Sequence, residues 1–368
     1  MLHTACFDWH VAHGGRMVEF AGWEMPVQYS TITQEHHAVR KAAGLFDIAH
    51  MGRLQFTGAD ACRFLDSLLT NDVAQLNMGR ICYALVTNEA GGILDDVLVS
   101  RFAEYYLMVV NASNRLKILE WIEQHRSGFD VTVDDLTAER FMLAIQGPRA
   151  VDILNPLVDA DISQLKYYSG AEVSVLDQAA LVSRTGYTGE DGFEVILPTA
   201  SGPKLWEALL EAGQGILPAG LGCRDTLRLE AAMPLYGHEL SESIDPFTAG
   251  LSFAVKLAAG DFLGKDALQA SQADSDRRKR VGLELSGRRI AREGAVLFAG
   301  DEEIGQVTSG TFSPTLEKSI AMGYVPPGSS DPGTEFEVDI RGKRHPATVV
   351  KLPFYRRASR ARHMTKHE

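Results

Sequence analysis

The 368-residue sequence has few cysteines, no long apolar run and no recognisable targeting segment. Its four cysteines are scattered and form no Cys-x-x-Cys pair, which fits a reducing compartment and neither a disulfide framework nor a zinc site. No stretch approaches the roughly 20 apolar residues of a membrane span, and residues 1–17 show no apolar signal core or run of basic residues. These absences predict a soluble intracellular protein.

Nucleotide and metal motifs are also missing. No GxGxxG follows a strand pattern and no GxxxxGKS or GxxxxGKT loop occurs, so dinucleotide and phosphate-cradling sites are unexpected. No HExxH or other close cluster indicates a metal ion, and we expect none. His36 and His37 are adjacent in a helical pattern and point in different directions, which favours surface or structural roles.

The charge is acidic overall and uneven along the chain. A formal net charge of −12 argues against nucleic acid as the main partner. Basic residues gather in RRKR at 277–280 and in the tail YRRASRARHMTKH at 355–367. Such a tail is most often a solvated end, and the alternative is that it docks an acidic partner.

Hydrophobic periodicity indicates a mixed fold with a different final part. Helical patterns cover residues 34–43, 59–69, 114–125, 147–157, 202–212 and 219–232. Strand patterns cover residues 51–57, 81–87, 93–101, 105–110, 140–145, 172–176, 179–184 and 193–198. The two kinds do not alternate as clean βαβ units, so an α+β fold is predicted. Beyond residue 280, short strands separated by turns predict a small sandwich or barrel, with a boundary at 245–280.

The segment GGILDDVLVS at 91–100 places two carboxylates in an apolar strand pattern. With the upstream run ICYALVT and the turn NEAGG, it predicts a β-hairpin. Neighbouring residues of a strand point to opposite faces, so Asp95 and Asp96 cannot share one pocket. Each aspartate has two interpretations: a partner for an internal donor, or a carboxylate held in a dry cleft where it stabilises a cation.

Two further stretches carry charges among apolar residues. SRTGYTGEDGFEVIL at 183–197 predicts a second hairpin, with Glu194 just after the turn. That carboxylate is expected to form a salt bridge or to accept two neighbouring N–H donors of a ligand, and Tyr187 at the turn offers an aromatic wall or a hydroxyl. In the helical pattern GLGCRDTLRLEA, Asp225 can pair with Arg228, which leaves Arg224 for a carboxylate elsewhere or for an anion.

The chain resembles the aminomethyltransferase family, the T-proteins of the glycine cleavage system. The resemblance runs from about residue 7 to about 356, in order and with family-like spacing. It rests on nine segments: FAGWEMPVQY (20–29), GLFDIAHMGR (44–53), NDV (71–73), NEAGGILDD (88–96), QGP (146–148), SRTGYTGEDGFE (183–194), GLGCRDTLRLEA (220–231), LYGHEL (235–240) and VTSGTFSPTLEKSIAMGYV (307–325).

The resemblance implies three domains arranged like a clover leaf around a central folate site. A discontinuous folate-binding domain would comprise residues 1–54 and 138–245, an inserted α+β domain residues 55–137, and a β-barrel-like domain residues 246–368. The implied reaction transfers the methylene of an aminomethyl group, held on the lipoyl arm of H-protein, to tetrahydrofolate. Ammonia leaves, 5,10-methylenetetrahydrofolate forms and the dihydrolipoyl H-protein is released.

The resemblance also implies roles for individual residues. Asp96, the second aspartate of the GGxxDD motif, would be catalytic and face the cleft, while Asp95 would be structural. Glu194 would bind the polar pterin edge, and Arg224 and Arg356 would contact the ligand. The side chains implied to line the pocket are those of Tyr83, Met51, Tyr187 and Tyr236.

Three positions depart from relatives of the family. Cys223 stands where alanine is common, Phe253 where tryptophan is often found, and Ser100 where some relatives carry an aromatic residue. These changes could loosen the wall of the pocket, but they remove no charged group.

Two related functions are the alternatives. A non-catalytic folate-binding protein of iron–sulfur cluster assembly would carry a KGCYxGQE-type motif, whereas this chain has LYGHEL and a complete GGILDD. A folate-dependent demethylation module usually adjoins a flavin domain, for which this chain has neither room nor fingerprint. A bacterial cytoplasm is expected, with the mitochondrial matrix as the location in a eukaryote.

Overall fold

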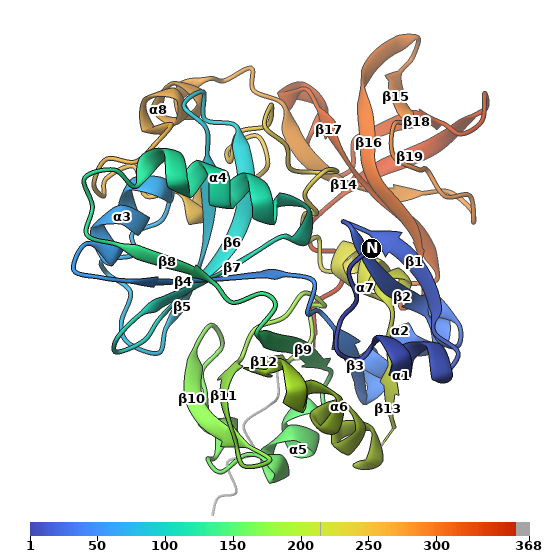
Figure 1. The fold of residues 1–368 in the computed structure, drawn as a ribbon. Coiled ribbons are helices and arrows are strands. Elements are labelled where there is room, and N and C mark those ends of the chain that lie inside the picture. Colours follow the sequence, from blue (N-terminus) through green and yellow to red (C-terminus); the bar gives the residue numbers. More distant parts are fainter. Residues whose placement is uncertain (214, 358–368) are drawn as a thin grey trace, which may run out of the picture.

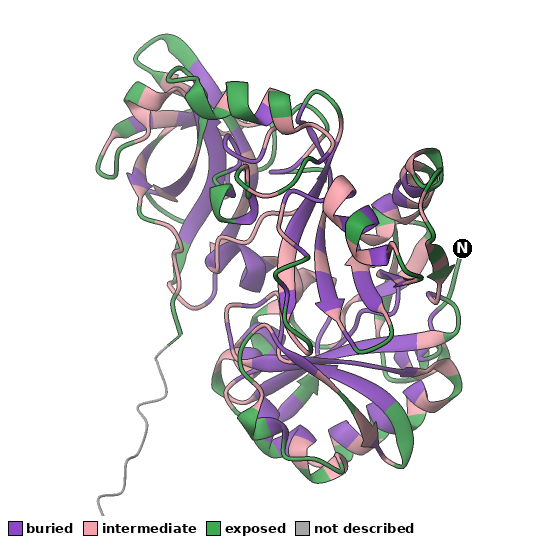
Figure 2. Cartoon of the chain, turned by 90° about the vertical axis from the view of Figure 1, so that its left-hand side faces the viewer, coloured by how far each residue is buried: buried purple, intermediate pink, exposed green. Residues whose placement is uncertain are grey.

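The computed structural model describes residues 1–213 and 215–357, and most of the basic tail at 355–367, with its two interpretations, lies outside them. Two sheets and a barrel surround a common centre, close to which helix α7 (Leu221–Glu230) lies (Figure 1). The mixed α+β fold and the C-terminal barrel are therefore confirmed. Figure 2 shows that the strands of the sheets are mostly buried and that exposed residues lie mainly on helices and loops.

The first sheet has six strands in the order β10-β11-β12-β9-β3-β13. They are β10 (Gly170–Val175), β11 (Gln178–Ser183), β12 (Gly192–Pro198), β9 (Arg140–Gln146), β3 (Ala43–Asp47) and β13 (Ile216–Pro218). Only the edge pair β13–β3 is parallel within the described part of this sheet. The neighbouring strands β9 and β3 join distant parts of the chain, because Gly44 of β3 faces Gln146 of β9.

Both faces of the first sheet are covered, which explains why its strands are apolar on both sides. In β9, Phe141, Leu143 and Ile145 belong to a core that includes Leu205 and Trp206 of α6. The covering helices are α1 (Phe7–Ala12), α5 (Ala150–Leu154) and α6 (Gly202–Glu211). The alternate residues Met142 and Ala144 belong to a core shared with α2 (Ile32–Lys41) and α7. A two-stranded ribbon, β1 (Arg16–Phe20) and β2 (Trp23–Gln28), packs against α7.

The second sheet is antiparallel, with the order β5-β6-β7-β4-β8. It consists of β5 (Ile81–Thr87), β6 (Ile93–Arg101), β7 (Tyr106–Val110), β4 (Gly52–Thr57) and β8 (Thr132–Asp135). Helices α3 (Ala61–Leu68) and α4 (Arg115–His125) share its main core. The hairpin predicted around 88–92 is present, because Asn88 and Gly92 close the turn by a 2.9 Å backbone hydrogen bond.

A closed six-stranded barrel forms the C-terminal part, in the order β14-β17-β16-β15-β18-β19. Its strands are β14 (Lys279–Leu285), β15 (Val296–Ala299), β16 (Glu302–Ser313), β17 (Lys318–Val325), β18 (Glu335–Asp339) and β19 (Arg344–Val350). The barrel closes because β14 pairs with both β17 and β19. Alternate inward residues such as Val281, Leu283 and Leu285 form its core.

The expected domain boundaries do not coincide with the sheets. The boundary at residue 54 falls inside β4, all of which pairs within the second sheet, so a division along the sheets would begin at Gly52. The segment before β14 contains α8 (Lys265–Ala273) and belongs with the second sheet, beside which α8 lies in Figure 1. In particular, Thr87 of β5 donates a 2.7 Å hydrogen bond to the Leu263 carbonyl.

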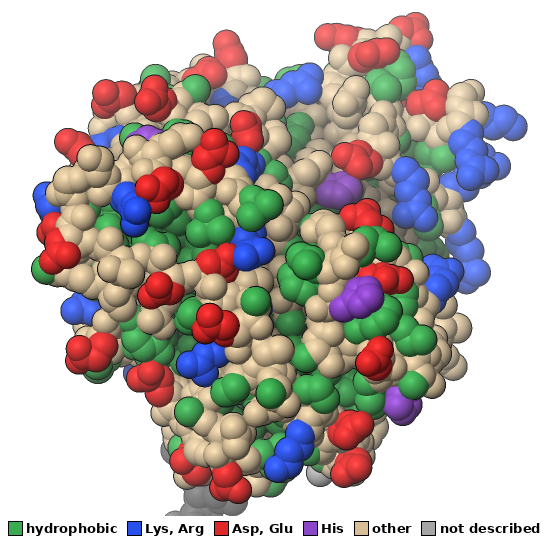
Figure 3. Space-filling model, in the orientation of Figure 1, with side chains coloured by type: hydrophobic (Ala, Val, Ile, Leu, Met, Phe, Trp, Pro, Cys, Tyr) green, Lys and Arg blue, Asp and Glu red, His purple; other side chains and the backbone are tan. Residues whose placement is uncertain are grey.

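Short 3₁₀ turns complete the described residues. They are η1 (Ala112–Asn114), η2 (Asn155–Leu157), η3 (Ile162–Gln164), η4 (Thr199–Ser201), η5 (Ser252–Ala254) and η6 (Pro327–Ser329). Acidic and basic side chains are interspersed over most of the face in Figure 3, and Lys and Arg gather at its right-hand edge over the barrel. No described helix is both long and apolar enough to span a membrane.

Candidate active site

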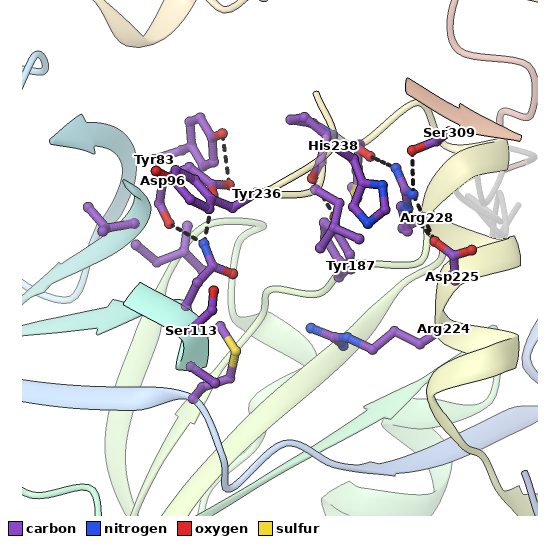
Figure 4. A pocket seen from close by; sticks show the side chains of 18 of the residues that line it. Tyr83, Asp96, Ser113, Tyr187, Arg224, Asp225, Arg228, Tyr236, His238 and Ser309 are labelled. Carbon is purple, nitrogen blue, oxygen red and sulfur yellow. Dashed lines mark hydrogen bonds and ion pairs between the residues drawn. The ribbon is translucent and has the colours of Figure 1, made fainter. Parts of the chain in front are cut away.

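A cavity of about 880 Å³ lies where the two sheets, α7 and the barrel meet. Residues from every one of these parts line it, including Asp96 of β6, Glu194 of β12, Arg224 of α7 and Ser309 of β16. Figure 4 shows Tyr83, Asp96 and Tyr236 on one side of the cavity and Arg224 and Arg228 on the other. The cavity is therefore built from segments that are far apart in the sequence.

The structure brings together all but one of the side chains expected at the site. The cavity is lined by Met51, Tyr83, Asp96, Tyr187, Glu194, Arg224 and Tyr236. Arg356 is different: it is exposed and borders a second, smaller hollow against β14 and β19. Among the described residues, its side chain donates a 3.5 Å hydrogen bond to the Leu352 carbonyl.

Asp96 is half-buried at the cavity wall, and both of its carboxylate oxygens accept hydrogen bonds. The Tyr83 hydroxyl donates to Oδ2 at 3.0 Å, and the Asn111 amide donates to Oδ1 at 2.7 Å. Burial raises the pKa of the Asp96 carboxyl, and these two hydrogen bonds oppose that rise because they favour the charged form. The site thus holds a directed carboxylate beside open space.

Asp95 points to the other side of β6, as strand alternation requires. Its side chain is completely buried, and the amides of Asn111 and Asn114 donate to its Oδ1 at 2.8 and 2.6 Å. Burial and the neighbouring Asp96 raise the pKa of Asp95. Asp95 is absent from the lining of the cavity, so the two aspartates have different surroundings.

Glu194 lies in β12 opposite Ala144 and is buried at the cavity edge. Thr185 donates to its Oε2 at 2.5 Å. Burial raises the pKa of Glu194, while Thr185 and the positive charge of Arg224 lower it. The carboxylate keeps an oxygen that can accept a further donor.

Arg224 lies in the first turn of α7 with its guanidinium 4.8 Å from the centre of the Tyr187 ring. Its buried Nη1 has no hydrogen-bond partner among the described residues. Burial lowers the pKa of Arg224, and the charge of Glu194 opposes that effect. Asp225 pairs instead with Arg228 at 2.8 Å, as expected from their spacing. A buried donor without a partner at a cavity is a binding position for an acceptor.

Aromatic side chains complete the wall. Tyr187 donates to the Pro234 carbonyl, which fixes its ring over Arg224. Lys117 donates to the Tyr236 hydroxyl at 2.7 Å. Phe253 stacks on Tyr83 with ring centres 5.7 Å apart, and it is 62% exposed at the mouth of the cavity.

His50 and Asn111 are two of the lining residues that sequence reasoning missed. His50 is buried, and burial together with the charge of Arg224 lowers its pKa to about 3, so the imidazole is neutral at physiological pH. Asn111 directly follows β7 and contacts both aspartates. In the sequence, each of these two residues is a polar residue that follows an apolar strand pattern. Such residues are too common for the pattern to identify a functional one.

The three positions that differ from relatives of the family, Cys223, Ser100 and Phe253, do not all lie at the cavity. Cys223 is buried in the core shared by α7 and the first sheet, and Ser100 is buried in β6. Only Phe253 lines the cavity. Among the described residues, no group of three His, Cys, Asp or Glu side chains could hold a metal ion.

Comparisons with known proteins cover nearly the whole chain. The family model of the GCVT N-terminal domain matches residues 6–259, and that of the glycine cleavage T-protein C-terminal barrel domain matches residues 278–356. An aminomethyltransferase of Symbiobacterium thermophilum is 50% identical, covering 97% of this chain and 98% of its own. One from Rubrobacter xylanophilus is 52% identical, covering 97% and 95%.

A solved structure has the same fold. The crystal structure of glycine cleavage system aminomethyltransferase T from Bartonella henselae superposes with a TM-score of 0.91 and is 37% identical. The match covers 96% of this chain and 98% of that chain.

Proposed function

The chain belongs to the glycine cleavage T-protein family, and on that premise we propose that it is an aminomethyltransferase. The methylene carbon of an aminomethyl group, carried on the lipoyl arm of H-protein, passes to tetrahydrofolate. The carbon–nitrogen and carbon–sulfur bonds break as bonds to the two folate nitrogens form. The hydrogens displaced from those nitrogens leave on ammonia and on the dihydrolipoyl sulfur, so the reaction balances without an added oxidant or reductant.

The charged lining of the cavity fits a reduced folate. The Glu194 carboxylate is able to accept two neighbouring N–H donors, which the polar edge of a pterin presents. The Nη1 of Arg224, which has no hydrogen-bond partner within residues 1–213 and 215–357, supplies a donor on the same side of the site. Met51, Tyr187 and Tyr236 would pack against the ligand and orient it. The assignment of Arg356 as a ligand contact stays a prediction.

Asp96 is the group that we assign to the chemistry. The carbon under attack becomes cationic, and a carboxylate already fixed beside it stabilises that charge without reorganising. The observation that carries this assignment is that Asp96 faces the same cavity as Glu194 and Arg224 with both oxygens held by donors. Tyr83 would act by directing the carboxylate.

Replacing Asp96 by asparagine tests this function. Asp96→Asn keeps the shape of the side chain and removes its charge, so turnover should fall about 10²-fold or more while folate binding stays close to wild type. The assay is tetrahydrofolate-dependent ammonia release from aminomethylated H-protein. A suitable control is Asp134→Asn, an exposed aspartate on β8 of the same sheet, which should retain full activity. Unchanged turnover in Asp96→Asn would contradict the proposal.

The proposed partner is lipoylated H-protein, and the proposed location is the bacterial cytoplasm. The first proposal follows from the family, and the second is supported by relatives that come from bacteria. Deleting residues 358–368 tests whether the basic tail takes part in docking. If the tail docks, the deletion lowers the affinity for H-protein and weakens its salt dependence.

A further inference from the structure

One amide group joins the two aspartates of β6. The Asn111 Nδ2 group carries two hydrogens, and it lies 2.8 Å from Asp95 Oδ1 and 2.7 Å from Asp96 Oδ1. The same group also lies 3.2 Å from the Asp96 backbone carbonyl oxygen, so its two shortest contacts are those to the two carboxylates. Asn111 itself lines the cavity, so this bridge lies between the buried side of β6 and the site.

Asp95 fixes the position of Asn111. Besides the side-chain contact, the Asn111 backbone N–H donates to Asp95 Oδ2 at 3.0 Å. Asn114 donates to Asp95 Oδ1 at 2.6 Å, and its own backbone N–H donates to the Asn111 carbonyl at 3.0 Å. The turn that follows β7 is thus wrapped around the buried Asp95 carboxylate.

We infer that Asn111 is a positioning residue, which fixes the Asp96 carboxylate at the cavity wall through the amide that Asp95 anchors. The inference rests on the proposed function of Asp96. Asn111 holds Oδ1 and Tyr83 holds Oδ2, so the carboxylate cannot turn about its bond to Cβ without losing hydrogen bonds. The lone pairs that remain are then presented in a constant direction to the cavity.

The same amide favours the ionised form of Asp96. The charge of Asp96 raises the pKa of Tyr83, Asp95, Tyr168 and Tyr187, and Arg224 and Arg228 line the opposite side of the cavity. Burial raises the pKa of Asp96, and the hydrogen bonds from Tyr83 and Asn111 oppose that rise. Without Asn111, the pKa of Asp96 should rise and the carboxylate should bind a proton at higher pH.

The test compares Asn111→Ala with Asn114→Ala. Both variants remove an amide that donates to Asp95, but only Asn111→Ala also removes the donor to Asp96. The measurement is the pH dependence of kcat and of KM for tetrahydrofolate from pH 5 to 9, with aminomethylated H-protein as the second substrate. Folding of each variant is followed by circular dichroism.

In Asn111→Ala, kcat at pH 7 should fall about tenfold or more, because a hydrogen bond to a charged group is lost. The acid limb should move to higher pH, so that raising the pH restores part of the rate, while KM changes less than about threefold. Asn114→Ala should keep the acid limb of the wild type. A wild-type acid limb in Asn111→Ala, or an equal shift in Asn114→Ala, would overturn the inference.

Two further results separate this inference from the proposed function. If Asp96→Asn is slow while Asn111→Ala has the wild-type profile, only the positioning role fails; if Asp96→Asn is fully active, the proposed function fails. Should Asn111→Ala not fold, Asn111→Asp keeps the shape of the side chain and replaces the donor by an acceptor. Failure of both variants to fold would show a structural role and would also overturn the inference.

Discussion

At the scale of single residues, Glu194 and Arg224 lie near each other in the cavity wall without a direct hydrogen bond. This matters for ligand binding. In the described residues Glu194 accepts a hydrogen bond from Thr185 and not from Arg224; burial raises the pKa of Glu194, and the charge of Arg224 opposes that rise. Because the two side chains do not bond to each other, the carboxylate can still accept and the guanidinium can still donate a hydrogen bond to a ligand. A completed salt bridge, which the sequence left as an equal alternative, would have used that capacity.

Glu194→Gln should weaken binding of tetrahydrofolate more than it slows chemistry. The amide presents one acceptor and one donor where the carboxylate presents two acceptors, so one ligand N–H loses its partner. Such a loss costs about 1–3 kcal/mol, which corresponds to roughly 5- to 150-fold in affinity. Titration calorimetry measures this directly, with Glu303→Gln on the barrel as an exposed control. Equal affinity in both variants would refute the role of Glu194.

Single residues were predicted from the sequence only where a period or a motif marked them. Strand alternation separated Asp95 from Asp96, and the family motif indicated which of them faces the cavity. Asn111 and His50 were not predicted, because their contacts are with residues that are distant in the sequence. Arg356 was placed by resemblance alone, and in the structure it borders a different hollow.

At the scale of secondary-structure elements, the turn of the hairpin β5–β6 holds this hairpin, which carries Asp96, in place. The Ile93 backbone N–H, just after Gly92, lies 3.1 Å from the Ser241 carbonyl and 3.0 Å from the Ile244 carbonyl. A Cβ atom on Gly92 would lie 1.8 Å from the Glu242 carbonyl oxygen, so any larger residue must displace this segment. Glycine is needed here for space.

Gly92→Ala should therefore lower the free energy of unfolding by about 1–3 kcal/mol, the usual cost of overpacking. Urea denaturation measures the change. The matched control is Gly260→Ala, where an added Cβ would have open space within 4 Å as far as the described residues extend. A Gly92→Ala protein as stable as this control would show that the segment at 241–244 moves freely.

Helix α7 and the barrel are joined by the buried carboxylate of Glu230. Ser313 donates to its Oε1 at 2.5 Å and Arg40 to its Oε2 at 2.8 Å. Burial acts to raise the pKa of Glu230, but hydrogen bonds and charges from His36, Arg40 and Ser313 outweigh it and lower the pKa to about 2. The Ser313 hydrogen bond thus joins α7 to the barrel, and the Arg40 ion pair joins α7 to α2.

Glu230→Gln should cost about 1–3 kcal/mol at pH 7, because Arg40 loses one buried partner and keeps its 3.2 Å ion pair with Glu190. The pKa of Glu230 in the folded state lies below its ordinary value of 4.5. Its contribution is therefore present above about pH 4.5 and is lost as the pH falls towards 2. The stability difference between wild type and variant should shrink over that range in chemical denaturation. A pH-independent difference would contradict this account, and exposed Glu302→Gln is the control.

Elements were predicted better than their ends. The expected helices and strands of the first 245 residues are present, because their apolar periods match the cores that they enter. The helix expected over 219–232 ends earlier, at Glu230, and Ala232 has a left-handed φ of 55°. Pro234 therefore follows a helix that has already ended.

At the scale of the whole molecule, the cavity unites parts that could otherwise unfold separately. Tetrahydrofolate that binds only the assembled cavity should stabilise all of them together. At about 100 times its dissociation constant it should add about 2.7 kcal/mol to the free energy of unfolding. Thermal denaturation over a range of ligand concentrations measures this stabilisation. At the same ligand concentration, the unfolding midpoint of Glu194→Gln should rise less than that of the wild type. A midpoint that does not depend on ligand concentration would exclude binding at this site.

The assembly of the sheets could not be derived from local patterns. Periodicity identifies a strand but does not say which strand it pairs with, so the expected insertion came from the family resemblance. Short strands separated by turns predicted a sandwich or a barrel beyond residue 280, and the family resemblance implied the barrel. The first sheet was not predicted, because its neighbours β3 and β9 are separated by the whole second sheet.

That separation has a consequence for biosynthesis. When the ribosome has released β3, its partner β9 has not yet been translated, and the second sheet emerges in between. The nascent chain can complete the second sheet first, whereas the first sheet must wait with its apolar strand uncovered. Arrest of translation before residue 140 should therefore yield a chain that needs a chaperone, and only synthesis through the barrel yields a cavity able to bind its substrates.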